Sequence, residues 1–441
     1  IIFLVMKEKL IEKATQILNN NNKGGFTIPS EGLYPFQWNW DSGFIAIGLA
    51  HINIELAKKE LESLLDAQWE NGFVPHIVFH NDSDSYFPGP DFHLSKLHPE
   101  ASKKYRTTGM TQPPVLGFVL QELYKIAEDK KAILEFIDSI IDKVFKKHTY
   151  LYENRDPNNE GLMYIWHNWE SGTDNSPIWD EVWSKMKNVP KYTFKRKDTT
   201  HIDASQRPSN EEYNNYLHLI EIAKLHNYNE QKIAENSPFL IQDPLFNAML
   251  IASNEALIEL YTKLGREENI DQLKAWQSKT IKNFNEKLFD ENLGAYIHYD
   301  LRNNTHIRKI TSSSFAPLFT SAPSTKQLEL MQNCYSEKFD TSDLYACASF
   351  DPTHQDFNPK KYWRGPVWIN LNWIIYKGFL KHDKQKLAEK IKNDSIELIE
   401  KFGFYEYFNP HRKLNNSEES NGCGGANFSW SAALLLDILN A

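Results

Sequence analysis

Tyr362-Trp363-Arg364-Gly365-Pro366-Val367-Trp368 is a polar, proline-bearing segment that stands directly before an apolar helix, predicted over residues 367–380. A second helix, predicted over 383–402, follows at once and carries many more charges. Proline in a first turn and Ser, Thr, Asp or Asn at a cap are ordinary helix-start signals. The pattern predicts a helical hairpin whose first, less charged helix is the buried one.

The same arrangement recurs along the chain. Less charged helices that follow polar, often proline-bearing segments are predicted at 43–53, 115–127, 245–264, 312–319, 367–380 and 429–439. More charged helices are predicted at 6–19, 54–69, 131–148, 209–227, 267–288, 325–336 and 383–402. Short β-hairpins are expected near 294–310 and 404–413, and a loop helix over 175–188. Alternating strands are otherwise almost absent, so we expect an all-α fold.

Hairpins of this kind can wrap into a closed double ring, in which all inner helices run in the same direction. Their N-terminal ends then meet at one mouth, where the positive ends of the helix dipoles add to the field. Residues at the starts of inner helices would gather there: Trp40, Asp41, Gln112, Asp243, Trp363 and Trp368. We therefore expect one toroidal domain over residues 1–441, with loop insertions at about 71–110, 152–208 and 404–427.

The composition excludes several classes of protein. The chain has 441 residues, a net charge of -9 and no block of like charges, so nucleic acid is not an expected partner. Three cysteines without a CxxC pair argue against a disulfide framework and against a zinc cluster. The apolar opening Ile1–Val5 is short for a signal peptide, and no run approaches the roughly 20 apolar residues of a membrane span. We expect a cytoplasmic protein without a membrane partner, and the sequence leaves its oligomeric state open.

Aromatic residues are unusually common, at 13% of the chain with 12 tryptophans. Most of these tryptophans stand in or beside the motif segments: Trp38, Trp40, Trp166, Trp169, Trp179, Trp363, Trp368, Trp373 and Trp430. Core packing alone would distribute them more evenly. Flat apolar rings with a polar edge are suited to grip the faces of a sugar.

One acidic segment favours a catalytic role, namely Trp169-Glu170-Ser171-Gly172-Thr173-Asp174-Asn175-Ser176-Pro177-Ile178-Trp179-Asp180. Its glycine, serines, asparagine and proline exclude the interior of a helix or strand, so a rigid turn is expected to hold Asp174 between indole rings. A carboxyl group kept dry by aromatic walls has a raised pKa, which suits a proton donor at neutral pH. We expect a second acid opposite it.

Glu406 is the best candidate for that second acid, because aromatic residues flank it in Phe404-Tyr405-Glu406-Tyr407-Phe408. Hydrolysis of a glycosidic bond uses two acids on either side of the bond. Glu418 and Glu419 are alternatives, although their Asn- and Ser-rich surroundings are typical of a solvated loop.

Asp41 and the histidine pair His76 and His80 are expected to have structural roles or to bind sugar, rather than to bind a metal. Asp41 is expected to cap the helix over 43–53 and also to accept hydrogen bonds from sugar hydroxyls. His76 and His80 have i,i+4 spacing, but neither an HExxH pattern nor a third ligand accompanies them. They are therefore not expected to bind a metal.

Several of these segments follow one another in an order that spans nearly the whole chain. They are Tyr34-Pro-Phe-Gln-Trp-Asn-Trp-Asp41-Ser, Asn71-Gly-Phe-Val-Pro-His76, Trp169-Glu-Ser-Gly-Thr-Asp174-Asn-Ser-Pro, Tyr362-Trp-Arg-Gly-Pro-Val-Trp368, and Glu406-Tyr-Phe-Asn-Pro with Phe428-Ser-Trp-Ser. In this order they resemble glycoside hydrolase family sixty-three, and most closely its short bacterial members that hydrolyse glucosylglycerate and mannosylglycerate. The resemblance implies an (α/α)6 toroid with long mouth loops and an inverting α-glycosidase that needs no metal or cofactor.

The resemblance also implies roles for individual residues. Asp174 matches the family's general acid and Glu406 its general base. The positions that line the sugar subsite match Tyr34, Trp38, Asp41, Gln112, Trp363 and Trp368, and Trp40 is counted with them at the mouth. In the glycerate-specific members an arginine and tyrosines hold the glycerate carboxylate, and Arg207, Tyr213 and Tyr362 fall where these are expected. A guanidinium fork suits a carboxylate lying in its plane.

Two other functions stay open. One is an α-glucosidase for neutral disaccharides or short oligosaccharides, which differs in whether a cation, Arg207 or Arg364, points into the aglycone subsite. The other is a catalytically silent carbohydrate-binding barrel, whose expected mark is the loss of one acid. Both acids are present.

Overall fold

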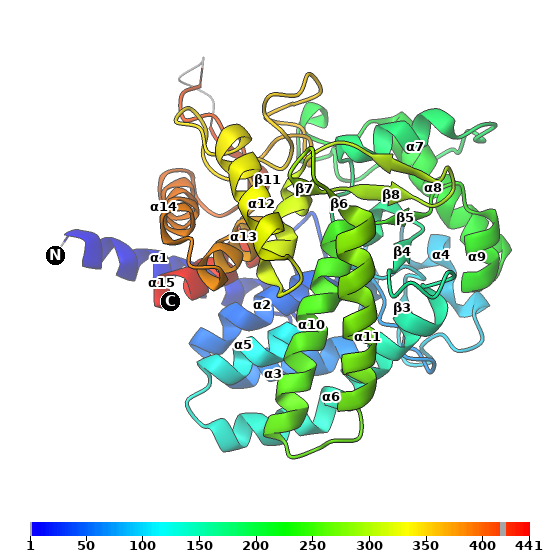
Figure 1. The fold of residues 1–441 in the computed structure, drawn as a ribbon, viewed down its shortest axis with the longest axis horizontal. Coiled ribbons are helices and arrows are strands. Elements are labelled where there is room, and N and C mark those ends of the chain that lie inside the picture. Colours follow the sequence, from blue (N-terminus) through cyan, green and yellow to red (C-terminus); the bar gives the residue numbers. More distant parts are fainter. Residues whose placement is uncertain (1, 415–419) are drawn as a thin grey trace.

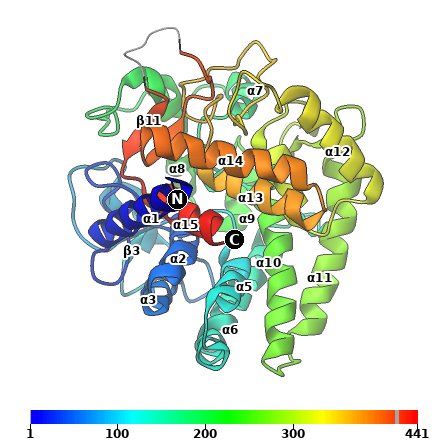
Figure 2. The ribbon, with the colours of Figure 1, turned by 90° about the vertical axis from the view of Figure 1, so that its left-hand side faces the viewer.

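Six inner helical elements form a closed ring in the described residues, 2–414 and 420–441, of this computed structural model (Figures 1 and 2). They are α2 (Asn39–Ile52), α5 (Leu116–Ile126), α10 (Pro244–Lys263), η6 (Ser312–Phe319), α13 (Ile369–Lys381) and α15 (Ser429–Asn440). Each element contacts the next in this order, and α15 packs against α2 to close the ring.

A second helix covers each inner element from the outside. The pairs are α1 (Ile2–Asn21) on α15, α3 (Ile54–Leu65) on α2, α6 (Lys130–Asn154) on α5, α11 (Ile270–Asn283) on α10, α12 (Thr325–Lys338) on η6 and α14 (Gln385–Phe402) on α13. In Figure 2, α2, α5 and α10 stand next to one another, with α3, α6 and α11 beyond them. The predicted all-α toroid of helical hairpins is therefore confirmed.

The shorter elements lie in the connections. The helical ones are α4 (Pro90–His93), η1 (Ser95–Leu97), η2 (Asn168–Ser171), η3 (Pro177–Trp179), α7 (Asp180–Lys185), η4 (Ala204–Gln206), α8 (Asn210–Leu225), α9 (Glu230–Asn236) and the π-helical η5 (Phe284–Leu288). One sheet has the order β1 (Gln37–Trp38), β2 (Ile77–Phe79), β3 (Arg106–Thr107), and another β4 (Tyr164–Ile165), β5 (Ile241–Gln242), β8 (His298–Asp300), β9 (Thr305–Ile307). Two pairs complete the set, β6 (Phe289–Asp290) with β7 (Ala295–Tyr296) and β10 (Tyr405–Phe408) with β11 (Gly422–Ala426). Figure 1 shows α7, α8 and the strands β4, β5 and β8 gathered at one end of α10 and α11.

Two local predictions need correction. The strand at 405–408 pairs with Gly422–Ala426, so the hairpin is wider than the 404–413 expected. The helix expected over 267–288 ends at Asn283, and a π-helical turn follows it. Most strands are only two or three residues long, which is too short for alternation to be recognised in the sequence.

The wall formed by η6 is a 3-10 helix because of its own sequence. Pro317 inside it has no N–H to donate, so an α-helical ladder is interrupted there. At its start, the N–H of Thr311 donates a hydrogen bond to the Ser314 hydroxyl at 3.2 Å. Seven of its eight residues are nevertheless buried, as an inner wall requires.

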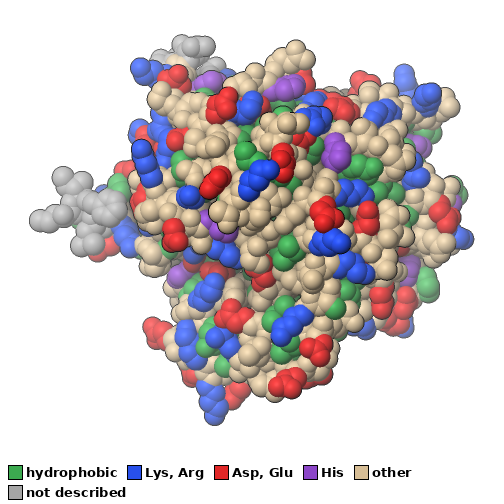
Figure 3. Space-filling view, in the orientation of Figure 1, with side chains coloured by type: hydrophobic (Ala, Val, Ile, Leu, Met, Phe, Trp, Pro, Cys, Tyr) green, Lys and Arg blue, Asp and Glu red, His purple; other side chains and the backbone are tan. Residues whose placement is uncertain are grey.

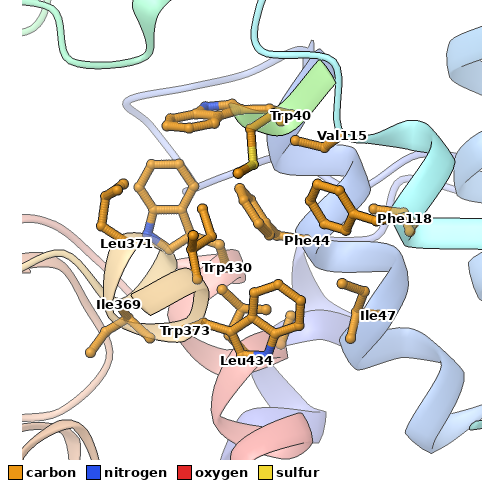
Figure 4. Close-up of a cluster of buried hydrophobic side chains, with 14 of the residues drawn as sticks. Trp40, Phe44, Ile47, Val115, Phe118, Ile369, Leu371, Trp373, Trp430 and Leu434 are labelled. Atoms are coloured by element: carbon orange, nitrogen blue, oxygen red, sulfur yellow. The ribbon is translucent and has the colours of Figure 1, made fainter. Parts of the chain in front are cut away.

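Large apolar side chains fill the middle of the ring below its mouth. Figure 4 shows Trp40, Phe44, Phe118, Trp373 and Trp430 converging from four inner elements. Trp40 and Trp430 meet edge to face at 5.8 Å between ring centroids. Gly48 lets α2 approach α15, because a Cβ there would lie 2.2 Å from the Cα of Ala433. Contacts of this density make the ring a rigid support for the residues at its mouth.

A charged cluster lies toward the C-terminal ends of the inner helices. Asp437 Oδ1 lies 2.9 Å from His51 Nε2, and its Oδ2 accepts hydrogen bonds from Lys377 Nζ at 2.9 Å and Trp373 Nε1 at 2.8 Å. Burial raises the pKa of Asp437, but the His51 hydrogen bond and the Lys377 charge hold that pKa well below its usual range. The cluster ties three inner helices together.

Asp437→Ala is expected to lower the free energy of unfolding by about 3 kcal/mol at neutral pH, because Lys377 loses its nearest partner in a largely buried place. A folded-state pKa below the unfolded value contributes stability above about pH 4, and this stability is lost as the pH falls. The difference between variant and wild type, measured by denaturant titration, should therefore shrink in acid. Asp66→Ala removes an exposed partner of Lys104 and should cost under about 1 kcal/mol. Equal losses in the two variants would contradict the role of Asp437.

On the face shown in Figure 3, basic and acidic side chains are interspersed, and no broad patch carries one sign of charge. Among the described residues, no helix combines the length and apolar character that crossing a membrane demands.

Candidate active site

The N-terminal ends of several inner helices open into one pocket, and the predicted site residues gather there. All of them line it: Tyr34, Trp38, Trp40, Asp41, Gln112, Asp174, Arg207, Tyr213, Tyr362, Trp363, Trp368 and Glu406. Asp243, which was expected at the same mouth, does not line this pocket. Its Oδ1 accepts a hydrogen bond from the N–H of Phe246 at 2.9 Å, and its Oδ2 lies 3.1 Å from His298 Nε2. That expectation was wrong because an aspartate before proline serves equally well as a helix cap.

Asp174 lies in the turn between η2 and η3, with its carboxyl group partly exposed to the pocket. Two side chains hold the turn. Asn168 Nδ2 donates a hydrogen bond to the carbonyl of Asp174 at 2.8 Å, and the Trp179 indole N–H donates one to the carbonyl of Thr173 at 2.9 Å. The hydroxyl of Tyr362 donates to Asp174 Oδ2 at 3.2 Å. Burial raises the pKa of Asp174 to about 7, against the opposing charge of Arg207. This carboxyl group is half protonated near neutral pH.

The other two acids of this segment hold it in place. Glu170 is fully buried and receives two hydrogen bonds from the guanidinium of Arg155, at 3.0 and 2.8 Å. Asp180 receives two from Arg364, at 2.9 and 2.6 Å. Such bidentate pairs have well-defined geometry, so the turn that carries Asp174 is fixed from both ends. Arg364 is therefore engaged with Asp180 and does not line the pocket.

Glu406 enters the pocket from β10 and is only 2% exposed. Its Oε1 accepts a hydrogen bond from the Tyr34 hydroxyl at 2.7 Å, and its Oε2 accepts one from the N–H of Gly425 at 3.0 Å. Burial raises the pKa of Glu406, while Arg207, Tyr34 and Gly425 oppose the rise. Gly424 has a φ of +71°, and a Cβ there would lie 2.5 Å from Glu406 Oε2, so the neighbouring strand needs glycine at this position.

Two tyrosine hydroxyls connect the carboxyl groups of Asp174 and Glu406. The Tyr34 hydroxyl, bonded to Glu406, lies 3.5 Å from the Tyr362 hydroxyl, which is bonded to Asp174. These contacts limit the separation of Glu406 Oε1 and Asp174 Oδ2 to less than about 9.5 Å, the upper end of the range for inverting glycosidases. The two acids therefore face one pocket from remote parts of the chain.

Arg207 brings a cation between these groups. It is 4% exposed, and its guanidinium lies over the Tyr362 ring at 4.1 Å. Its Nη1 is 3.6 Å from Glu406 Oε1, beyond hydrogen-bond distance. Within the described part of the chain, this buried Nη1 has no hydrogen-bond partner. It therefore meets its acidic neighbour Glu406 in an ion pair without a hydrogen bond.

Asp41 lines the pocket but does not cap a helix, which corrects the sequence interpretation. Helix α2 begins earlier, at Asn39, and places Asp41 in its first turn. The side chain of Gln112 caps the helix instead, because its Oε1 accepts from the N–H of Trp40 at 3.0 Å. Burial raises the pKa of Asp41 well above its usual value, and the charges of Glu406 and Asp174 add to the rise.

Aromatic rings form the walls. Trp363 and Trp368 stack with ring centroids 3.7 Å apart, and the Trp368 indole N–H donates to the carbonyl of Tyr362 at 3.0 Å. Trp38 meets Tyr34 edge to face at 5.2 Å. The ring of Tyr213, on α8, lies under the guanidinium of Arg196 at 4.3 Å. Rings fixed by their neighbours present flat surfaces at little conformational cost.

Sequence reasoning missed several lining residues. These are Pro29, His76, Tyr86, Trp169, Gly172, Asp198, Phe428 and Trp430. His76 stacks on Trp169 at 6.1 Å, and burial lowers its pKa well below the usual value, so it is neutral. His80 lies apart from it, 2.7 Å from Gln37 Oε1. No cluster of three or more His, Cys, Asp or Glu suited to a metal occurs among the residues described.

Most of these residues lie in or beside the aromatic motifs, which could have indicated them. Asp198 lies in no such motif. It stands in a polar stretch without glycine, proline or aromatic neighbours directly beside it. The two alternatives to Glu406, Glu418 and Glu419, lie outside the described residues.

Gly172→Ala is expected to lower the free energy of unfolding by about 2 kcal/mol, since Gly172 has a φ of +73° and a Cβ there would lie 2.4 Å from the Trp40 ring. The shift would also displace Asp174, two residues further on, so the initial rate on a glycoside should fall by about tenfold or more. Gly89→Ala is the control, because its added Cβ meets nothing within 4 Å. Thermal denaturation and initial rates check both variants. Wild-type stability in Gly172→Ala would contradict the close packing described here.

Comparison with known proteins assigns the family. The family model for the mannosylglycerate hydrolase MGH1-like glycoside hydrolase domain matches residues 34–431. A mannosylglycerate hydrolase of Thermus thermophilus is 39% identical over 427 residues, which is 96% of this chain and 99% of that protein. A glucosylglycerate hydrolase of Mycolicibacterium hassiacum is 32% identical over 443 residues, 98% of each chain.

Solved structures agree. The crystal structure of a GH63 mannosylglycerate hydrolase from Thermus thermophilus, in complex with Tris and D-glycerate, matches with a TM-score of 0.89 and 38% identity, covering 97% of this chain and 99% of that one. A neutral trehalase of Saccharomyces cerevisiae, 13% identical with a TM-score of 0.61, shares the fold alone. The resemblance stated from the sequence is confirmed: this chain belongs to the mannosylglycerate hydrolase MGH1-like family of glycoside hydrolases.

Proposed function

We propose that this protein is an inverting α-glycosidase that hydrolyses glucosylglycerate or mannosylglycerate, with Asp174 as general acid and Glu406 as general base. The observation that carries the proposal is the pocket that these two carboxyl groups share with a buried arginine, whose Nη1 has no hydrogen-bond partner in the described part of the chain. A sugar between the aromatic walls would place its glycosidic oxygen toward Asp174 and its anomeric carbon toward Glu406.

The environment of each acid suits its proposed role. Asp174, with its pKa raised to about 7, keeps a proton that it delivers to the departing oxygen. Glu406 takes a proton from a water that attacks the opposite face of the ring. The Tyr34 hydroxyl and the Gly425 N–H fix the orientation of the Glu406 carboxylate in the pocket.

Arg207 supports a charged aglycone. Its guanidinium is planar and always charged, and it lies over the Tyr362 ring with Nη1 lacking a hydrogen-bond partner among the described residues. A glycerate carboxylate would satisfy that donor in a charge-assisted hydrogen bond, with Tyr213 on the same side of the pocket. A neutral aglycone leaves the donor buried and unpaired, which is costly.

We also propose a single catalytic domain over residues 1–441, with insertions at about 71–110, 152–208 and 404–427. The contact of α15 with α2 supports it, because the ring needs both ends of the chain. Each insertion supplies pocket residues: Tyr86 from the first, Asp174 and Arg207 from the second, and Glu406 from the third. A cytoplasmic location is supported by Cys334 and Cys347, which are buried and form no disulfide.

The test compares glucosylglycerate and mannosylglycerate with their glycerol analogues, while NMR follows the anomer released first. We expect kcat/KM to be at least about tenfold higher for the charged substrates, in line with one charge-assisted hydrogen bond. The β-anomer should appear first. Equal rates would exclude the glycerate preference and favour neutral α-glucosides. The α-anomer would exclude inversion, and binding without release of sugar would indicate a silent barrel.

A further inference from the structure

We propose that Asp198 is a positioning residue, which holds the guanidinium of Arg207 at the aglycone subsite and keeps its ion pair with Glu406 from closing into a hydrogen bond. The inference rests on the proposed function, because it concerns how the same pocket selects an anionic aglycone. It concerns a residue that has no motif in the sequence and that lines the pocket beside Arg207.

Asp198 is itself fixed from one side. Its Oδ1 accepts a hydrogen bond from Arg196 Nε at 2.9 Å, and its Oδ2 accepts one from Arg196 Nη2 at 2.6 Å. Arg196 is in turn held by the ring of Tyr213 and by a hydrogen bond to the carbonyl of Pro208. Asp198 is 7% exposed, so this bidentate pair is shielded from water.

From this fixed position, Asp198 Oδ2 accepts a further hydrogen bond from Arg207 Nε at 3.0 Å. This bond and the contact with the Tyr362 ring, 4.1 Å from the guanidinium carbon to the ring centroid, hold the guanidinium in place. The Nε side is thereby occupied, and the terminal Nη1 lies on the side of Glu406, which lines the pocket. A planar guanidinium held in this way can offer its terminal N–H groups to a carboxylate.

Glu406 is the competing partner for Arg207. Its Oε1 lies 3.6 Å from Arg207 Nη1. This distance is too long for a hydrogen bond, but the two groups form an ion pair. A small rotation of the guanidinium would bring the two groups into direct contact. That contact would satisfy Nη1 without substrate and would occupy the proposed base, so the Nε anchor on Asp198 keeps both groups available.

The charges around Arg207 support the same interpretation. It faces Asp198, Glu406, Tyr34 and Tyr362. Arg196 offsets the charge of Asp198 through its bidentate pair, so Asp198 orients Arg207 without fully neutralising it. Arg207 thus offers a positively charged group to an anion, although acidic groups surround it.

The test uses Asp198→Ala and Asp198→Asn with charged and neutral substrates, glucosylglycerate and glucosylglycerol or the mannosyl pair. In Asp198→Ala, KM for the charged substrate should rise by about tenfold or more, and KM for the neutral one by less than about threefold. In the same variant kcat should fall on both substrates, because Arg207 rotates onto Glu406. Asp198→Asn should keep more of the discrimination, since an amide oxygen can still accept from Arg207 Nε. Asp142→Ala is the matched control, as it removes a carboxylate from a guanidinium on the outer surface.

Inhibition by D-glycerate gives a second measurement. Its inhibition constant should rise in Asp198→Ala, whereas inhibition by the free sugar should change little. A rise of KM in equal proportion for both substrates would show a merely structural role and overturn the inference. Unchanged discrimination in Asp198→Ala, with a wild type that prefers the charged substrate, would also overturn it. A wild type without that preference would remove the proposed substrate and this inference together. If Asp198→Ala does not fold, Asp198→Asn and Arg196→Gln decide, and full discrimination in both would exclude the role.

Discussion

Asp174→Asn is expected to lower kcat on glucosylglycerate or mannosylglycerate by about 10²–10⁴-fold, the usual contribution of a general acid. The amide preserves the shape of the side chain and its contact with Tyr362, but it has no proton to give to the departing oxygen. Fluoride leaves without protonation, so hydrolysis of the corresponding glycosyl fluoride should fall by less than about tenfold. Initial rates on the two substrates measure this contrast. Asp142→Asn, on the outer surface, should change neither rate.

A fall of equal size on the glycoside and the fluoride would contradict acid catalysis by Asp174. It would indicate instead that the variant has lost the architecture of the pocket. The matching Asp142→Asn variant separates this outcome from a general effect of replacing an aspartate by asparagine.

The pH dependence of the wild-type enzyme tests the same group. Burial raises the pKa of Asp174 to about 7, and the proposed general acid acts in its protonated form. The rate should therefore decline as the pH rises through about 7, by about tenfold per pH unit at the alkaline end. Asp174→Asn should lose this limb of the profile. A limb that persists in the variant would assign it to another group.

The pH dependence of the free energy of unfolding tests the raised pKa of Asp174 independently of activity. A carboxyl group whose pKa is raised in the folded state binds its proton more tightly there than in the unfolded chain. Its ionisation therefore destabilises the fold as the pH rises from about 4 toward 8. Asp174→Asn has no charge to bury, so its melting temperature at pH 8 should equal or exceed that of the wild type. A catalytic group that reduces stability is typical of active sites.

The sequence predicted the ring and both acids for physical reasons that are local. Polar segments that begin apolar helices must place those helix starts at a surface. The spacing of apolar residues along each helix indicates which of its faces is buried. The context of Asp174, with its glycine, asparagine and proline, excludes regular structure whatever the rest of the chain does. The aromatic flanks of Glu406 likewise indicate a dry site.

Other features depend on partners far away in the chain. Helix α2 begins at Asn39 because Gln112, 72 residues after Trp40, accepts a hydrogen bond from the Trp40 N–H, so the first turn needs no local cap. Asp243 and Asp41 look alike in the sequence, yet one is turned into a cap and the other into the pocket. Asp198 acquires its place only when Arg196 and Arg207 are brought to it. Contacts between residues far apart in the chain leave no periodic pattern in the sequence, so they cannot be predicted from it.

Glu406→Ala is expected to lower kcat on a glycerate glycoside by about 10²–10⁴-fold, because no carboxylate remains to take the proton from the attacking water. The Tyr34 hydroxyl and the Gly425 N–H stay in place and border the space that the side chain leaves. Azide is a nucleophile that needs no deprotonation, so it should restore turnover with a glycosyl fluoride and give the β-glycosyl azide. An α-azide would place Glu406 on the leaving-group side instead.

The control for Glu406→Ala is Glu389→Ala, an exposed position on α14, which should keep the wild-type rate and gain nothing from azide. The azide experiment is needed because a variant with a collapsed pocket would also turn over slowly. Azide would not restore the rate of such a variant. Undiminished turnover in Glu406→Ala would exclude it as the base. The β-azide, together with β-sugar from the wild type, requires attack from the Glu406 side of the ring and departure on the Asp174 side. That geometry in turn requires the two carboxyl groups to be held across one pocket by different parts of the chain, as the closed ring provides.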